Sequence, residues 1–188
     1  SRIEVASAGG YLSYENIADK ATVAGVEVEV RKNLFVRPLS SAANGMNKLS
    51  FGLNGSYIYT NAKMPLATVT TGSQLEGAAP WIANFDLSHN FTKGNHSFIN
   101  TLVFNYVSDK IYTIGTQGYQ DIIEQGMMTL DFVSQAKLNK YVSLTLKARN
   151  LLNPSYKLSR KANESGEKVV LSDYKKGINI SLGVSCTF

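Results

Sequence analysis

The sequence KKGINISLGVSCTF, residues 175–188, decides the predicted fold of the chain. From Ile178 to Phe188 every second residue is apolar, Cys186 included, and the residues between them are small and mostly polar. Successive side chains of a strand point to opposite faces, so this pattern predicts a strand with one apolar and one polar face. A tilted strand of about 10 residues is long enough to cross the hydrocarbon core of a membrane.

The last residue separates two classes of β protein that both contain alternating strands. A strand of a soluble sandwich alternates in the same way, but this one ends on an aromatic residue in phase with the apolar face. Bacterial outer-membrane barrels characteristically end like this, and the resemblance implies that the barrel-assembly machinery recognises the last strand. The residues of this predicted assembly signal are Ile180, Leu182, Val184 and Phe188.

The composition excludes a membrane-spanning helix and leaves a barrel or a soluble β protein. No run of apolar residues approaches the roughly 18 that a transmembrane helix needs, although 44% of the 188 residues are hydrophobic. Barrel strands spread their apolar residues by alternation, so they give no such run. The net charge of +5 comes from Lys and Arg scattered along the chain, which argues against nucleic acid as a partner. Cys186 is the single cysteine and is expected to act as a small hydrophobic residue.

Further strands are predicted from the same two-residue period. The clearest is in residues 21–32, where three valines alternate with two acids and a base: Val26, Val28 and Val30 against Glu27, Glu29 and Arg31. The others lie in residues 11–15, 48–60, 81–91, 98–107, 127–138 and 142–149, with a turn expected at 16–20. Together with the terminal strand, this gives about eight strands.

Two hairpins have a register that the sequence fixes. The apolar residues are odd-numbered in residues 81–91 and even-numbered in 98–107, so the loop between these strands must have an even length. The pair Gly94 and Asn95 tolerates positive φ and provides such a turn, which predicts that Phe91 faces Phe98. By the same register Phe85 faces Phe104. The next hairpin keeps an even phase on both sides and requires a three-residue turn at 139–141.

The connections between strands are expected to alternate in length. Residues 61–79, 108–126 and 151–175 are predicted to be long loops, and the turns between them are tight. Outer-membrane barrels have short periplasmic turns and long external loops, so this order predicts a periplasmic C-terminus. Residues 33–47 fit least well, since this predicted loop should be tight.

Several stretches resemble the C-terminal barrel of TonB-dependent outer-membrane receptors, including the SusC-like branch. Residues 25–29 are similar to that family's "Gly–Val–Glu–hydrophobic–Glu" strand, and residues 80–84 to its "Pro–aromatic–x–x–Asn" strand start. Residues 150–156 look like its "Asn–Leu–x–Asp–x–x–Tyr" element, with Asn153 in place of the commoner Asp. The resemblance covers residues 11–188.

The resemblance implies an architecture and a set of partners. Residues 1–188 would be the C-terminal part of a transmembrane antiparallel β-barrel of about 22 strands, with no plug domain or signal peptide in this chain. Implied partners are outer-membrane lipid, the plug domain and remaining barrel strands, the TonB system through the N-terminal part, and a SusD-like surface lipoprotein.

The charged residues of the predicted strands are candidates for the lumen wall. They are Glu27, Glu29, Arg31, Asp131, Lys137, Lys147 and Arg149, and the last four are expected on adjacent strands, where opposite charges can pair. A solvated inner wall is the favoured explanation for them, and contact with a plug or substrate is the alternative. Asp121, Glu124 and Gln125 are expected in an outer loop.

No chemistry beyond binding is predicted. His89 and His96 could meet across a hairpin, but no Cys or carboxylate cluster joins them, which argues against a metal site. No nucleophile elbow or phosphate-binding loop occurs, so neither a cofactor nor enzymatic activity is expected.

Three functional hypotheses remain open at this point. The first is a receptor barrel that takes up a bulky nutrient such as a glycan, a peptide or a metal complex, or that serves as a platform in a larger outer-membrane complex. The second is an independent eight-stranded barrel with a structural or adhesive role. The third is a soluble β domain that binds a ligand.

Overall fold

The computed structural model of the chain describes residues 2–4, 12–14, 20–39, 45–63, 74–115, 119–162 and 166–187. Every strand pairing in these ranges is antiparallel. No helical segment of the described chain has the length and hydropathy that crossing a bilayer requires. The expected turn at 16–20 falls largely, and Phe188 entirely, outside the described residues.

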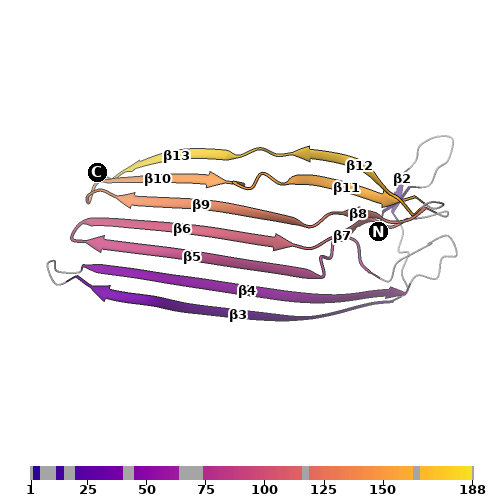
Figure 1. Cartoon of the computed structure of the whole chain (residues 1–188), viewed down its shortest axis with the longest axis horizontal. Coiled ribbons are helices and arrows are strands. Elements are labelled where there is room, and N and C mark those ends of the chain that lie inside the picture. The colour runs from indigo at the N-terminus through magenta and orange to yellow at the C-terminus, as the bar shows by residue number, and fades with distance from the viewer. Residues whose placement is uncertain are drawn as a thin grey trace.

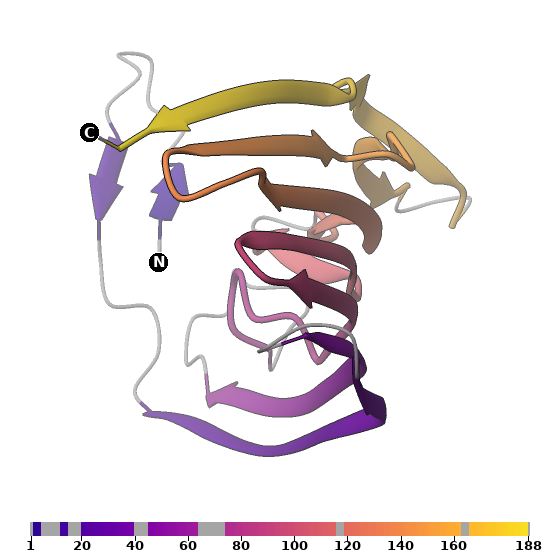
Figure 2. The same cartoon turned by 90° about the vertical axis from the view of Figure 1, so that its left-hand side faces the viewer.

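A seven-stranded sheet forms the body of the structure (Figure 1). In spatial order its strands are β3 (Lys20–Pro38), β4 (Met46–Lys63), β5 (Trp81–Lys93), β6 (His96–Val107), β9 (Met127–Lys137), β10 (Val142–Arg149) and β13 (Asn179–Cys186). Viewed along the strands, the sheet is curled into an open arc with β3 and β13 at its two edges (Figure 2). The structure is therefore a piece of curved wall whose edge strands do not pair with each other.

The register gives this wall one apolar and one polar face. One row of directly paired residues crosses five strands and is apolar throughout: Val30, Leu53, Phe85, Phe104 and Leu130. The neighbouring row points to the other side and is polar throughout: Glu29, Asn54, Asn84, Asn105 and Thr129. The predicted pairs Phe91–Phe98 and Phe85–Phe104 are both confirmed, because the hairpin turns at Gly94 with φ 60°.

A second sheet of four short strands extends the wall at the end opposite the turn between β5 and β6 (Figure 1). We call it the outer sheet; its strands are β7 (Lys110–Thr113), β8 (Ile122–Glu124), β11 (Ser155–Lys161) and β12 (Lys168–Lys175). The expected loops at 108–126 and 151–175 are therefore wrong in part, because each contains two of these strands. Glu124, expected in a loop, lies in β8 and pairs with Lys110 and Leu158.

The shorter connections also differ from the expectation. β3 continues to Pro38 and β4 starts at Met46, so the predicted loop at 33–47 is much shorter, and a bulge near Leu34 explains its broken alternation. The facing ends of β3 and β4, at Pro38 and Met46, and the turns at 94–95 and 138–141 all lie at one end of the wall, which we call the tight-turn end. The strand expected near residue 11 is β2 (Leu12–Tyr14), but it pairs with β1 (Arg2–Glu4) and not with the wall.

Interruptions in four neighbouring strands separate the wall from the outer sheet. We call residues 108–109, 125–126, 150–154 and 176–178 the strand junction. Asn150 and Asn153 have left-handed φ values of 59° and 44°, which asparagine tolerates better than most residues. Side chains replace part of the lost ladder: the Asn150 amide Nδ2 donates to the Gly177 carbonyl at 2.7 Å, and Gly177 N donates to Asn153 Oδ1 at 3.0 Å.

The buried apolar side chains of the described residues are few and lie away from the tight-turn end. They are Ala62, Ala79, Ile111 and Ile114. The segment before β5 packs there, since Gly77 N donates to the Ile111 carbonyl at 2.8 Å and Ile114 N to Glu76 Oε1 at 2.9 Å. The apolar face of the wall stays uncovered: Ile180, Leu182 and Val184 are 70%, 72% and 64% exposed. A face this apolar requires a non-aqueous environment or a partner.

Candidate functional site

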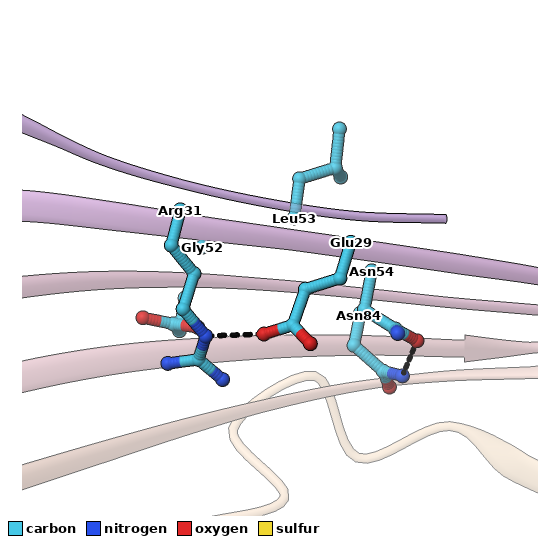
Figure 3. Close-up of a pocket in the computed structure, with 7 residues that line it drawn as sticks. Glu29, Arg31, Gly52, Leu53, Asn54 and Asn84 are labelled. Carbon is cyan, nitrogen blue, oxygen red and sulfur yellow. Dashed lines mark hydrogen bonds and ion pairs between the residues drawn. The ribbon is translucent and has the colours of Figure 1, made fainter. Parts of the chain in front are cut away.

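Polar side chains form a ladder across the first three strands of the wall (Figure 3). Asn84 Nδ2 donates to Asn54 Oδ1 at 3.2 Å, and Asn54 Nδ2 donates to Glu27 Oε1 at 2.6 Å. In Figure 3 the Leu53 side chain points to the opposite side of the sheet. The alternation of each strand therefore sorts its polar groups onto one side, where they bind one another.

A hollow of about 250 Å³ lies over this ladder. Glu29 and Arg31, which form an ion pair, line it together with Asp86. Gly52 makes room for Asp86, because a Cβ at this position would lie 3.1 Å from the Asp86 Cγ and closer still to a carboxylate oxygen. Side chains from β3, β4 and β5 line this hollow.

A second hollow, of about 360 Å³, lies on the same face at the strand junction. Asp131, Arg149 and Asn179 line it from the wall, and Tyr156 and Lys176 line it from the outer sheet and its approach. The ammonium group of Lys176 lies 5.6 Å from the centre of the Tyr156 ring. The Tyr156 ring lies 5.0 Å from that of Tyr174, its partner across β11 and β12. This hollow combines aromatic faces with charged and amide groups.

The outer sheet above this hollow holds two ion pairs. Lys110 Nζ lies 3.2 Å from Glu124 Oε1, and Lys157 Nζ lies 3.0 Å from Asp173 Oδ2. Partial burial, with the Glu124 carboxylate 3.3 Å from its hydroxyl, raises the pKa of Tyr156 to about 12. A hydrogen bond from Lys157 lowers the pKa of Asp173 below its ordinary value.

The structure brings together only some of the predicted luminal residues. Glu29 and Arg31 meet in the first hollow, with Glu27 in the ladder beside it, and Asp131 and Arg149 meet in the second. Lys147 pairs with Ser181 and Val133, and Lys137 with Ser97 and Ser143, so both lie apart from these clusters. All seven residues share the polar face through the register.

The expected ion pairs between β9 and β10 are wrong. In the described part of the chain, Asp131 forms no ion pair with Lys147 or Arg149. Its carboxylate accepts a hydrogen bond from the backbone N–H of Asn150 at 2.8 Å instead. Asp131 thus supports the left-handed turn at the end of β10, which is a structural role.

Several residues of the two hollows were not expected from the sequence. They are Gly52, Asn54, Asn84 and Asp86 in the first, and Lys176 and Asn179 in the second. Their numbering was a usable signal, because each polar residue alternates with the apolar residues of its strand. The amides have no charge that would mark them as candidate site residues, although they form most of the hydrogen bonds of the ladder.

Among the residues that the structure describes, neither hollow contains a cluster of side chains that could hold a metal ion. Within the described ranges, no three His, Cys, Asp or Glu side chains lie close enough together to hold a metal ion. His89 and His96 do not meet: His89 pairs with Leu49 and Asn100, and His96 with Lys93. The arrangement can bind polar and charged groups along a surface.

Comparison with known proteins gives one match. The family model described as "TonB dependent receptor-like, beta-barrel" matches residues 1–151. No curated protein and no solved structure matches the chain.

Proposed function

The chain belongs to the family of TonB-dependent receptor β-barrels, and from this premise we propose that it forms wall strands of a receptor that imports a bulky nutrient. Members of this family are outer-membrane receptors and transporters, not enzymes, and they work with a plug domain, the TonB system and membrane lipid. The observation that carries the proposal is the two-faced, curled sheet, six of whose seven strands lie within the matched residues. The nutrient would be a glycan, a peptide or a metal complex.

In this proposal the polar face lines the lumen and the apolar face contacts lipid. Glu27, Glu29 and Arg31 would then face the plug or the passing solute from one part of the wall, and Asp131 and Arg149 from another. Lys137 and Lys147 would complete the polar lining. The support is the register, which keeps all of them in phase with Asn54 and Asn84, opposite the valines and phenylalanines.

The two open edges support a larger barrel. β3 and β13 have unpaired backbone groups along their outer edges, and in a bilayer such groups must pair with further strands. An independent eight-stranded barrel would need one strand to join β3 and β13, but in the described residues they are at opposite edges with none between them. A barrel of about 22 strands, with residues 1–188 as its C-terminal part, provides neighbours for both edges.

The orientation and the partners belong to the same proposal. The tight-turn end would face the periplasm together with the C-terminus, and the outer sheet would face the outside. Ile180, Leu182, Val184 and Phe188 would present the signal for barrel assembly. The chain would fall in the SusC-like branch, with a SusD-like surface lipoprotein over the outer sheet.

Cysteine labelling in the intact receptor tests the placement of the two faces. In receptor reconstituted in lipid vesicles, E29C on the polar face should react with a water-soluble maleimide, whereas V30C, its neighbour on the apolar face, should be protected. For orientation, K168C in the outer sheet should be labelled in intact cells, and N95C in the turn only after the outer membrane is opened. Equal labelling of E29C and V30C would refute the wall, and labelling of N95C in intact cells would refute the orientation.

Uptake tests the transport role itself. Cells that depend on the receptor should grow on its nutrient only when TonB is functional, and a panel of glycans, peptides and metal chelates identifies the class. Growth that is independent of TonB would contradict the proposal.

A further inference from the structure

The charged side chains at the tight-turn end of the wall are all positive. They are Arg37, Lys48, Lys93, Lys137 and Lys140. The sequence has no Asp or Glu in residues 30–50, 87–100 or 132–146, which form this end. The outer sheet at the other end mixes both signs, as its two ion pairs show. A ligand of the tight-turn end is therefore expected to be anionic.

A group of polar residues interrupts the apolar face near this end. We call Arg37, Asn47, His89, Asn100 and Ser134 the outward polar arc; these residues come from β3, β4, β5, β6 and β9. On β5, His89 alternates in phase with Leu87 and Phe91, so it shares their face of the sheet. Arg37 pairs with Asn47, His89 with Asn100, and Asn100 with Ser134. A side-chain hydrogen bond between His89 and Asn47 joins the two parts, so the arc is continuous.

Two hydrogen bonds satisfy part of this arc. The His89 imidazole Nε2 donates to Asn47 Oδ1 at 2.8 Å, and Ser134 Oγ donates to Asn100 Oδ1 at 2.7 Å. Both bonds use the amide oxygens. In the described part of the chain, neither Asn47 Nδ2 nor Asn100 Nδ2 donates to a protein acceptor. Two amide groups therefore offer N–H donors on a face that should contact lipid, where an unpaired donor is costly.

The depth of the arc in a membrane follows from β5. Trp81 and Phe91 share the apolar face and lie ten residues apart, or roughly 25 Å along the membrane normal for a strand tilted by about 40°. This matches the apolar band of outer-membrane barrels, which aromatic residues flank on both sides. Trp81 packs on Tyr57 with ring centres 4.5 Å apart, and Phe91 pairs with Phe98 at the other boundary.

The members of the arc then lie at two levels. Arg37 pairs with Asn47, and Asn47 pairs with Phe91, so the guanidinium group starts at the boundary of the hydrocarbon. Lys93 lies two residues beyond Phe91, at the level of the headgroups. His89 and Asn100 lie one paired row deeper, inside the band. The cations Arg37 and Lys93 therefore lie at or beyond the boundary together with the Asn47 amide, and the Asn100 amide lies one row deeper. A phosphate at the boundary and ester carbonyls at and just below it, as in a glycerophospholipid, match these groups. Lys32 lies deeper on the same face and is not part of the arc.

We propose that the outward polar arc, with Lys93 beside it, is a binding site for an anionic glycerophospholipid. The phosphate lies against Arg37 and Lys93, and the ester carbonyls accept hydrogen bonds from Asn47 Nδ2 and Asn100 Nδ2. The inference rests on the proposed orientation, which places the tight-turn end in the periplasmic leaflet. An acidic protein segment would satisfy the cations but would have no reason to reach donors inside the apolar band.

Lipid retention by the intact receptor tests the site. Receptor in mild detergent is incubated with diacyl phosphatidylglycerol, diacyl phosphatidylcholine or diether phosphatidylglycerol, and the bound lipid is counted by native mass spectrometry. The wild type should prefer phosphatidylglycerol to phosphatidylcholine by about fivefold for each cation involved. It should also retain the diacyl form better than the diether form, which lacks ester carbonyls.

Three variants separate the contributions. R37Q/K93Q should lose the preference for phosphatidylglycerol, while K20Q/K168Q removes the same charge from the opposite end and should keep it. N47L/N100L should keep the charge preference but lose the discrimination between diacyl and diether lipid. Heat-modifiable migration on gels checks that each variant is folded.

Two results would overturn the lipid site. The first is a wild type that retains phosphatidylglycerol and phosphatidylcholine equally, in which case an acidic protein segment would be the ligand of the cations. The second is a wild type that does not distinguish ester from ether linkage. Preferential retention of lipopolysaccharide would place the tight-turn end in the external leaflet and overturn both the choice of lipid and the orientation. TonB-dependent uptake, measured in the same strains, shows whether the transport role fails separately.

Discussion

Asn150 should be the most sensitive residue of the strand junction, and two substitutions separate its roles. Its backbone has φ 59°, and its side chain donates to the Gly177 carbonyl at 2.7 Å. Asn150→Gly keeps the backbone conformation but loses the hydrogen bond, which costs about 1 kcal/mol. Asn150→Ala loses the same bond and adds the strain of a left-handed alanine, for a total of about 2–3 kcal/mol.

The free energy of unfolding of the receptor, refolded into lipid vesicles and titrated with urea, measures the difference. The ranking should be wild type, then Asn150→Gly, then Asn150→Ala, with at least about 1 kcal/mol between the two variants. Leu152→Ala is the matched control, because Leu152 lies in the same segment and is 48% exposed. If Asn150→Ala is as stable as Asn150→Gly, the left-handed turn does not carry the junction and the reasoning is refuted.

Three further predictions concern single contacts. Asn153→Asp should be neutral within about 0.5 kcal/mol in the same titration, because only Oδ1 is used, whereas Asn153→Ala should cost about 1 kcal/mol or more. Gly52→Ala should destabilise the wall by about 1 kcal/mol and be rescued by Asp86→Ala, since a Cβ at Gly52 meets the Asp86 carboxylate; additive effects in the double-mutant cycle would contradict the contact. Tyr156 has a pKa of about 12 against an ordinary value of 10.0, so it contributes stability that is complete below pH 10 and is lost as the pH rises toward 12. Tyr156→Phe should flatten that alkaline loss, and an unchanged pH profile would show that Tyr156 is not its source.

The wall could be predicted from the sequence because its strands are long and alternate without interruption. The odd and even numbering of apolar residues on β5 and β6 fixed the Phe91–Phe98 pair before any coordinates, and the two-residue turn left no other register. The same parity assigned Glu29 and Arg31 to one face. Over strands of this length the period of two outweighs local irregularities.

The outer sheet could not be predicted for the opposite reason. β7 has four residues and β8 has three, so neither completes enough periods to stand out from a loop. β11 and β12 contain a register shift near Leu158, which breaks the alternation that would have revealed them. Lys and Asp on short strands resemble a solvated loop when only their composition is considered.

The site was predictable in its residue types and not in its contacts. Asp131 was expected to pair with a base across the sheet, but its carboxylate accepts a hydrogen bond from the backbone N–H of Asn150 instead. This N–H is available because Asn150 adopts a left-handed turn, which the sequence alone does not reveal. Amide residues such as Asn54 carry no charge, so the sequence gives no sign that they belong to a site.

The strand junction lets the two sheets change independently. Past this level the backbone ladder no longer runs uninterrupted from β10 into β11 or from β13 into β12, and asparagine side chains fasten the pieces together. Insertions or exchanges beyond Asn153 can therefore change the outer sheet without disturbing the register of the wall strands. A graft that replaces residues 155–175 with the equivalent segment of another receptor, and leaves Asn150 and Gly177 in place, should still assemble in the membrane.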